Sequence, residues 1–482
     1  MRHCWRMEFL EKSLMSFRSC FSRERTFKWF VILVLSFILR DDHNGVTSAI
    51  RTFALSPSNY NLLLWFFRSN GYVTENLRQC WYNLIKESPF LVKVSGRFVL
   101  IGDGVKQAKE GRRMPGVKKM SQESENSSKP EYIFGHQFGA IGVVVGNGIK
   151  MFCLPLVMNI QDGLKSTSQW AKSSYSDASQ IVQTIIKGFE AARVIGKNYF
   201  LLDRYYLSVP ALETLNSLNA GANEKLMDIV TKGKSNIVAY EKPQPVEKPK
   251  RGRPRKKGDK VHLSSLFEEV DKFEDAQVAI YGKKQTVSFL SRDLLWGQKL
   301  YQELRFVLVS MEDGKRSILV STDTGLSEKE IIELYAHRFK IESCFREFKQ
   351  QIGGFDYHFW TSALEKLKHF TKKGEPDPLT KITNKDKQRN ILKAADAIER
   401  FVALACIAMG LVQLMALSVK DPVQVQKFRY LRTYTYGAIS EATMMYFFRH
   451  VIFAILAWRP ESFITRYIRE AQALPWSENE SK

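Results

Sequence analysis

The chain has 482 residues, of which 44% are hydrophobic, so it can build several globular cores and is not a mainly disordered protein. Lysine and arginine number 72 against 50 aspartate and glutamate, and the formal net charge is +22. This excess predicts a polyanionic partner, with nucleic acid first and an anionic membrane surface second. The 6 cysteines are dispersed, with no CxxC pair and no zinc-spaced cluster, which favours a reduced, cytoplasmic setting.

Residues 1–95 are expected to form a helical N-terminal region, because aromatic and aliphatic residues recur there at helical intervals between basic ones. We interpret this region as a DNA-binding bundle. Its most apolar stretch, residues 29–39, is too short to cross a bilayer, and no signal-peptide cleavage site follows it. We therefore predict a buried helix there. A membrane-surface protein is the alternative that this stretch and the positive charge leave open.

Residues 96–203 show the pattern of the first part of a mixed α/β sheet. Apolar runs at 97–101, 138–146 and 150–158 predict strands, and the first of them ends at Gly102-Asp103-Gly104. A helical pattern at 177–195 and a fourth strand-like run then lead to Asp203. Strands and a helix in this order indicate an α/β domain.

Residues 204–317 interrupt this scheme and are expected to form a β-rich insertion with a basic linker at 241–260. A second catalytic part at 318–360 and a helical C-terminal region at 361–482 follow. Ser327 and Glu330 have the spacing of a capping box, which predicts that a helix begins between the last strand-like run and Tyr335.

Residues 335–349 (YAHRFKIESCFREFK) place functional groups on one face of a helix. If each residue turns by about 100°, Arg338, Glu342 and Lys349 lie within about 60° of Tyr335. An adjoining apolar stripe can seat this helix on a core, and it contains Leu334, Ile341, Phe345 and Phe348. A solvated face with ordinary charge pairing is the alternative that the geometry alone leaves open.

Three carboxylates are candidates for the metal ligands that two-metal phosphoryl transfer requires. Two hard cations about 4 Å apart must share oxygen ligands that converge from separate elements. Asp103 and Asp203 are expected at strand ends, and Glu342 is expected on a helix.

The spacing Tyr335-x2-Arg338-x3-Glu342-x6-Lys349 resembles the Y-R-E-K signature of bacterial insertion-sequence DDE transposases, the group called insertion-sequence family four. The surroundings are similar as well: IGDG resembles the first catalytic strand, and YFLLDRYYLSVPALETL resembles the second aspartate with its following helix. The run GGFDYHFW follows the glutamate helix. The resemblance covers residues 50–360, approximately.

This resemblance implies an RNase H-like fold with a β-rich insertion, and a DNA transposase that cleaves insertion-sequence ends and transfers the 3′-OH into target DNA. Asp103, Asp203 and Glu342 would hold two Mg²⁺ ions, with Mn²⁺ as a substitute. Tyr335, Arg338 and Lys349 would bind DNA phosphates, in keeping with their basic and hydrogen-bonding groups. The expected partner is double-stranded DNA, both transposon ends and target, in the bacterial cytoplasm with the nucleoid and without a membrane.

By analogy, a homodimer on DNA is expected, and the apolar helices of residues 390–458 are the candidates for its interface. The rival function is a catalytically inactive, transposase-derived DNA-binding protein, which would keep the charge and the fold without needing the carboxylates.

Each candidate residue has a structural alternative. Asp103 between two glycines fits a hairpin turn, and Asp203 fits a helix cap. Glu342 fits an exposed helix charge, while Arg338 and Lys349 fit ion pairs on their own helix.

Two further features concern DNA. Some relatives carry a tryptophan in the last insertion strand that stacks on a flipped base, but residues 317–320 contain no aromatic residue; Trp296, further upstream, is the candidate substitute. In the linker, Arg251 and Arg253 form an Arg-Gly-Arg-Pro core that favours phosphate or minor-groove contact, with a solvated tether as the alternative.

Overall fold

The computed structural model describes residues 4–122, 130–244, 255–280, 282–369, 375–437 and 439–472. The chain divides into two compact units. Unit 1 comprises residues 1–91, 104–178 and 342–482, and unit 2 comprises residues 92–103 and 179–341. The mixed α/β class predicted from the sequence is confirmed, because each unit contains both helices and strands.

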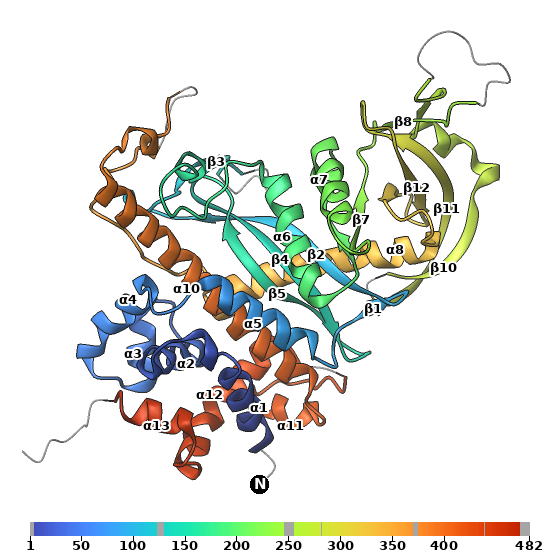
Figure 1. Ribbon diagram of the computed structural model, residues 1–482. Helices are drawn as coiled ribbons and strands as arrows, with labels where there is room; N and C mark the ends of the chain where they lie inside the picture. The colour runs from blue at the N-terminus through green and yellow to red at the C-terminus, as the bar shows by residue number, and fades with distance from the viewer. Residues whose placement is uncertain are drawn as a thin grey trace, which may run out of the picture. The chain divides into compact units, whose positions relative to one another are not determined.

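The helices of unit 1 come from both ends of the chain, and Figure 1 shows the N-terminal and C-terminal helices gathered together. They are α1 (Cys4–Met15), α2 (Glu24–Leu39), α3 (Thr47–Phe53), α4 (Tyr60–Arg68), α5 (Thr74–Lys86), α10 (Lys385–Leu417), α11 (Pro422–Lys427), α12 (Glu441–Trp458) and α13 (Phe463–Arg469). Helix α2 packs against α10, α12 and α13. The described residues up to Lys86 are thus largely helical, and the N-terminal DNA-binding region stays a prediction.

The apolar stretch at residues 29–39 lies in α2, and every one of these residues is buried. The predicted buried helix is thus confirmed. Among the described residues, one helix, α10, is long and apolar enough to cross a membrane. Because 89% of its most apolar window is buried inside the protein, α10 has the surroundings of a core helix.

Unit 1 also contains antiparallel strands. They are β3 (Lys118–Ser121), β4 (Tyr132–Gly146), β5 (Met151–Ile160) and residues 104–108 of β2 (Arg97–Ala108). Strand β4 pairs with β3 on one side, and β5 pairs with β4 through a bulge at Ile141 and Gly142. Helix α10 packs on β5, whose residues from Phe152 onward are buried. Strand β3 was not predicted.

Unit 2 contains a mixed sheet with the strand order β2-β6-β7-β13-β12-β11-β8-β9. In addition, β1 pairs with β2, and β10 pairs with β11. The strands are β1 (Lys93–Val94), residues 97–103 of β2, β6 (Asn198–Leu201), β7 (Met227–Lys232), β8 (Val238–Tyr240), β9 (Lys260–His262), β10 (Glu274–Ile280), β11 (Lys283–Trp296), β12 (Gln302–Met311) and β13 (Arg316–Ser321). The register makes β2, β6 and β7 parallel, whereas β13 runs antiparallel to β7.

The helices of unit 2 are α6 (Gln180–Ile195), α7 (Val209–Ala220) and α8 (Glu328–Ala336), and α6 and α7 lie side by side (Figure 1). The predicted helix before β6 is confirmed, and strands β10, β11 and β12 lie in the stretch that was expected to be rich in β-strands. Strands β7, β8 and β9 were missed. Strand β7 lies inside the stretch that we expected to form the insertion, yet it pairs in parallel with β6.

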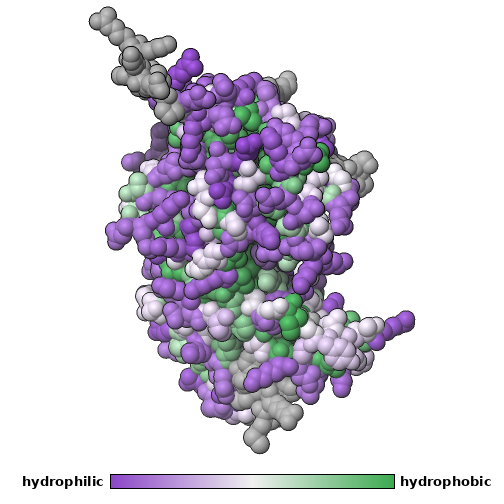
Figure 2. All heavy atoms as spheres, turned by 90° about the vertical axis from the view of Figure 1, so that its right-hand side faces the viewer, coloured by the Kyte–Doolittle hydropathy of each residue, from purple (hydrophilic) through white to green (hydrophobic). Residues whose placement is uncertain are grey.

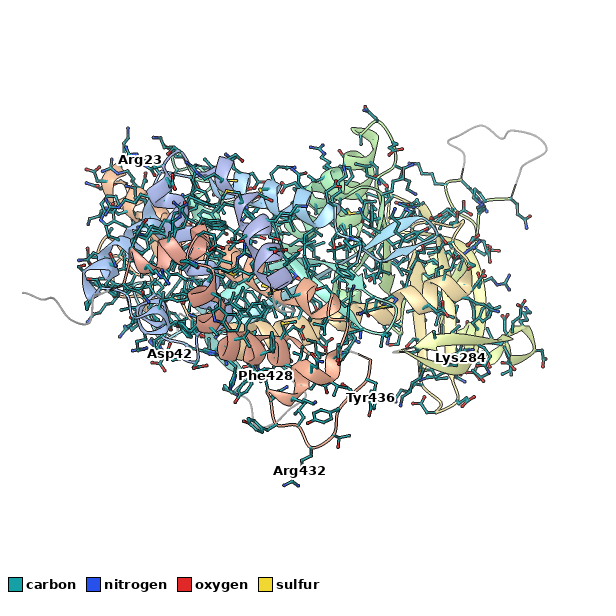
Figure 3. All side chains as sticks on the ribbon, turned by 90° about the horizontal axis from the view of Figure 1, so that it is seen from below. Arg23, Asp42, Lys284, Phe428, Arg432 and Tyr436 are labelled. Carbon is teal, nitrogen blue, oxygen red and sulfur yellow. The ribbon has the colours of Figure 1, made fainter. Side chains whose placement is uncertain are left out.

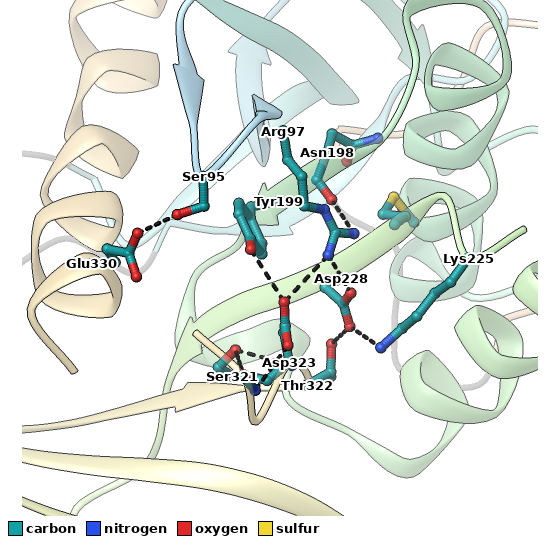
Figure 4. Close-up of polar contacts among 12 residues, drawn as sticks. Ser95, Arg97, Asn198, Tyr199, Lys225, Asp228, Ser321, Thr322, Asp323 and Glu330 are labelled. Atoms are coloured by element: carbon teal, nitrogen blue, oxygen red, sulfur yellow. Dashed lines mark hydrogen bonds and ion pairs between the residues drawn. The ribbon is translucent and has the colours of Figure 1, made fainter. Parts of the chain in front are cut away.

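A buried ionic cluster joins the amino ends of the parallel strands (Figure 4). Arg97 of β2 lies 2.8 Å from Asp228 of β7 and 3.3 Å from Asp323, which follows β13. Asp228 is fully buried, and Lys225 and Thr322 each approach its second oxygen at 2.6 Å. Because every oxygen of this carboxylate has a partner, the cluster holds the starts of β2 and β7 and the end of β13 together.

The helix predicted from the capping box begins as expected, since Ser327 and Glu330 make both capping contacts at the start of α8. The uniform helix through Lys349 is wrong. A 3₁₀ turn at His337–Phe339 separates α8 from α9 (Lys340–Glu347), and a π-helical turn follows at Phe348–Ile352. The 3₁₀ turn is tighter than an α-helix and the π-helical turn is wider. A constant rotation of about 100° per residue therefore does not describe the stretch.

The face of the molecule in Figure 2 is largely hydrophilic, with hydrophobic residues exposed in scattered patches. Such a surface agrees with the many charged residues in the sequence.

Candidate active site

Asp103 and Asp203 occupy equivalent positions on two neighbouring parallel strands of unit 2. Ile101 of β2 is paired with Leu201 of β6. Asp103 lies two residues after Ile101, and Asp203 lies two residues after Leu201. Adjacent strands lie about 4.8 Å apart, and residues two apart face the same side of a sheet. The two aspartates therefore come together at the carboxyl end of the parallel strands, where α/β sheets usually bind their ligands.

Asp103 lies inside strand β2, which continues to Ala108, so the hairpin-turn alternative is wrong. The glycine before it has a packing role. A Cβ atom at Gly102 would approach the Phe200 ring at 2.5 Å and the Leu202 side chain at 2.9 Å. The glycine that suggested a turn thus allows β2 to lie against the side chains of β6 and its continuation.

Asp203 follows β6 in an extended conformation and makes no side-chain capping bond to the short 3₁₀ helix Arg204–Tyr206. Helix α7 is capped by Ser208 instead. The capping alternative for Asp203 is therefore wrong, and its carboxylate is not used to begin a helix.

Tyr206 is a site residue that the sequence analysis missed. Its side chain is 4% exposed. Burial raises the pKa of Tyr206, and the negative charges of Asp103 and Asp203 raise it further. Both carboxylates thus act on the same buried phenol. The run YFLLDRYYLSVPALETL contains this tyrosine, but nothing in the run distinguishes the buried Tyr206 from the exposed Tyr205.

Arg338, in the 3₁₀ turn after α8, contacts the first aspartate. Its Nη1 lies 3.3 Å from Oδ2 of Asp103, and the two side chains are 16% and 23% exposed. A guanidinium beside a half-buried carboxylate offsets part of its charge. Tyr335 is partly buried in the last turn of α8, in the same unit. The sequence-predicted group that unit 2 brings together is thus Asp103, Asp203 and Arg338.

Glu342 and Lys349 belong to unit 1. Glu342 is exposed near the start of α9, whereas Lys349 is partly buried in the π-helical turn. The Nζ of Lys349 donates to the backbone carbonyl of Lys106 at 3.1 Å. Lys106 lies on β2, three residues after Asp103 in the sequence. Lys349 therefore contacts strand β2 and not only its own helical segment.

The donor chemistry of unit 2 fits a divalent cation. Mg²⁺ and Mn²⁺ prefer carboxylate oxygens, and Asp103 and Asp203 supply two carboxylates from adjacent strands. Within the described part of the chain, no group of three or more His, Cys, Asp or Glu side chains is arranged to hold a metal ion. The two aspartates are therefore a partial ligand set.

Trp296 lies at the end of β11 and lines a pocket of about 400 Å³ in unit 2. Tyr240, Lys257 and Tyr301 line the same pocket, and the ammonium of Lys257 lies 3.7 Å from the centre of the Tyr240 ring. Whether Trp296 contacts a base stays a prediction. Arg251 and Arg253 of the predicted DNA hook lie outside the described residues.

Comparisons with known proteins concern the segment that carries most of these residues. Residues 173–368, less than half of the chain, match the family model described as "Transposase DDE domain". The segment contains Asp203, Glu342 and the three phosphate-binding candidates around it, whereas Asp103 precedes it. No curated protein sequence matches the chain.

Among solved structures, the chain is similar to the one described as "Cryo-EM structure of piggyBac transposase synaptic complex with hairpin DNA". The sequence identity is 14% and the TM-score is 0.37, with 98% of this chain and 84% of that chain covered. The family match supports a transposase with a DDE domain, a family whose chemistry depends on divalent metal ions.

Proposed function

We propose that the protein is a DNA transposase of the insertion-sequence family four type, which cleaves the ends of its element and transfers the freed 3′-OH into target DNA. The observation that carries this proposal is the parallel register of β2 and β6, in which Ile101 is paired with Leu201, two residues before Asp103 and Asp203. The family match over residues 173–368 supports the same reaction class.

In this proposal, Asp103, Asp203 and Glu342 are the ligands of two Mg²⁺ or Mn²⁺ ions. When bound, such a pair would activate the attacking oxygen and stabilise the leaving oxygen of a phosphodiester. Arg338 neutralises Asp103 in the absence of DNA and turns toward a scissile phosphate when DNA is present. Tyr335 and Lys349 bind neighbouring phosphates, as the Y-R-E-K spacing favours.

Tyr206 has a positioning role in this scheme. Its phenol is buried next to both aspartates and keeps its proton, because burial and both negative charges raise its pKa. A neutral phenol can donate a hydrogen bond to a carboxylate oxygen. Such a bond would orient the carboxylates toward the metal ions.

The proposed fold is RNase H-like, with a β-rich insertion between Asp203 and Glu342. The proposed partners are transposon ends and target DNA in the cytoplasm, bound by a homodimer. Helix α10 is buried within unit 1, so we assign the dimer contact to exposed side chains of α12, of which Phe453 is 52% and Trp458 is 76% exposed.

The rival function is a transposase-derived DNA-binding protein without catalysis. It needs a basic surface but has no use for paired strand-end carboxylates. The placement of Asp103 and Asp203 at equivalent positions of β2 and β6 therefore favours the catalytic function.

The test is cleavage of a labelled duplex that carries the element's own ends, with Mg²⁺ or Mn²⁺ and with EDTA. Asp203→Asn and Glu342→Gln should abolish cleavage while DNA binding is retained. Glu213→Gln, which changes an exposed carboxylate on α7, is the matched control and should cut like the wild type. Binding without metal-dependent cleavage by the wild type would support the rival function.

A further inference from the structure

The segment between α11 and α12 has an unusual surface composition. Residues 427–437 (KFRYLRTYTYG), here called the Arg/Tyr loop, lie in unit 1. Tyr430 is 86% exposed and Tyr436 is 85% exposed, and Lys427, Arg429 and Arg432 are also exposed. No acidic residue occurs in the sequence between Asp421 and Glu441. The loop therefore presents cations and aromatic rings together, and Figure 3 shows it projecting from the helices with Arg432 at its outer end.

The base of the Arg/Tyr loop is held by specific contacts. Gln426 is 2% exposed, and its side-chain amide donates to the backbone carbonyl of Thr435 at 2.6 Å and accepts from the Thr435 N–H at 2.9 Å. Phe428 packs edge-on against Phe447 of α12, with ring centroids 5.0 Å apart. Because its two ends are fixed, the loop presents its tip in one place and loses less conformational freedom on binding.

The conformation of the tip does not bury its rings. Tyr430 has φ +53°, a left-handed conformation that costs energy for a residue with a side chain. A tyrosine held in this conformation with 86% of its surface exposed contributes little to the core. The position therefore calls for an explanation other than packing within the described chain.

We propose that the Arg/Tyr loop is a second DNA-contact surface, which binds single-stranded or unpaired DNA. Lys427, Arg429 and Arg432 contact phosphates, while Tyr430 and Tyr436 stack on bases. Aromatic rings stack on any base that is not already stacked in a duplex, and cations follow the backbone. The proposal rests on the proposed function only for the identity of the polyanion as DNA.

Charge and chemistry favour DNA over other occupants. Three cations without an intervening acid complement a phosphodiester chain. A membrane-inserting loop would carry exposed Trp, Phe or Leu at its tip, whereas the described loop has no Trp, its Phe428 packs on Phe447, and Leu431 is not fully exposed.

The test measures binding of the full-length protein to fluorescent oligonucleotides by anisotropy, with a single strand, a duplex containing a single-stranded gap, and an intact duplex. The double variant Tyr430→Ala/Tyr436→Ala should bind the single strand and the gapped duplex about tenfold more weakly or worse, with little change for the intact duplex. Tyr430→Phe/Tyr436→Phe keeps the rings and should bind like the wild type.

Two controls separate this surface from general effects. Trp360→Ala removes another exposed aromatic ring of unit 1, and Lys385→Gln/Lys387→Gln removes two exposed cations at the start of α10; neither should affect the preference for unpaired DNA. In a salt series, Lys427→Gln/Arg432→Gln should reduce the slope of log K against log salt by about 1.4 for a single strand.

Unchanged affinity of the tyrosine-to-alanine variant for the single strand and the gapped duplex would overturn the proposal. So would tyrosine-dependent flotation with anionic vesicles together with tyrosine-independent binding of DNA. The cleavage assay keeps the two proposals apart. A wild type that does not cut but binds single strands through these tyrosines would contradict the proposed function and support the Arg/Tyr loop.

Discussion

The guanidinium of Arg338 lies 3.3 Å from the carboxylate of Asp103, and the two residues are far apart in the sequence. One is a candidate phosphate ligand and the other is a candidate metal ligand. Their contact means that the basic and acidic parts of the candidate site meet within unit 2. It also means that a cation on Asp103 must share or replace the contact with Arg338.

Replacing Arg338 should separate metal binding from cleavage. Arg338→Gln removes the competing positive charge, so the affinity of Asp103 for Mn²⁺ should increase, while cleavage should slow by about 10- to 100-fold because a charged hydrogen bond to phosphate is lost. Calorimetric titration of Mn²⁺ and the rate of end cleavage measure the two effects. Arg316→Gln, which changes a half-exposed arginine on β13, is the control. A parallel loss of metal affinity and cleavage would contradict the assigned role.

Metal binding should stabilise the wild type through the paired aspartates. At a concentration 100 times its Kd, a ligand of the folded state adds about 2.7 kcal/mol to the free energy of unfolding. Asp103→Asn and Asp203→Asn should each remove most of the Mn²⁺-dependent increase in Tm. Asp271→Asn, at an exposed position of unit 2, should retain it. An undiminished increase in both aspartate variants would place the metal elsewhere.

The cluster around Asp228 should be a major contributor to stability. Arg97→Ala leaves a fully buried carboxylate without one of its partners, which typically costs about 3 kcal/mol in the free energy of unfolding. Removing an exposed ion-pair partner in Lys315→Ala should cost far less, because solvent screens this pair with Asp313. Urea denaturation measures both values. Equal small losses would show that the buried cluster adds no more than a surface ion pair.

Stability should fall on acidification because of His136. This ring is fully buried in unit 1, with Nδ1 2.7 Å from the Tyr357 hydroxyl and Nε2 2.8 Å from the Pro115 carbonyl oxygen. Burial lowers the pKa of His136 to about 4. Between about pH 6.5 and 4 the unfolded state binds the proton and the folded state does not, so up to about 3 kcal/mol is lost as the pH falls through this window.

Comparison of wild type with His136→Gln isolates this effect. The pKa of Asp396 is raised to about 6, mainly by burial, and its contribution has the opposite sign in much of the same window, but it is present in both proteins and cancels in the difference. The variant should be less stable at pH 7 and should lose less stability between pH 7 and pH 4.5. His262→Gln, at an exposed position, should keep the wild-type slope, and an unchanged slope for His136→Gln would contradict the prediction.

The sequence was sufficient where local pattern determines local structure. Ser327 and Glu330 located the start of α8, and the apolar run from Trp29 predicted a buried helix. The periodicity of apolar residues could not reveal the 3₁₀ and π turns around α9. Each turn spans only a few residues and changes the rotation per residue only within that short stretch.

The misses depend on contacts between distant residues. The glycines beside Asp103 resemble a turn in sequence, and their role appears only when Phe200 and Leu202 are placed against Gly102. Strand β7 is short, and its pairing with β6 is set by the fold rather than by its own pattern. For the same reason, Tyr206 could not be separated from Tyr205, because burial decides which phenol meets the aspartates.

The most direct test of the central claim is the rate of cleavage of a duplex carrying the element's ends in Mn²⁺, for wild type, Asp203→Asn, Glu342→Gln and the control Glu213→Gln. The account predicts metal-dependent cutting by the wild type and the control, and binding without cutting by the other two. Cleavage that survives both Asp203→Asn and Glu342→Gln would contradict it.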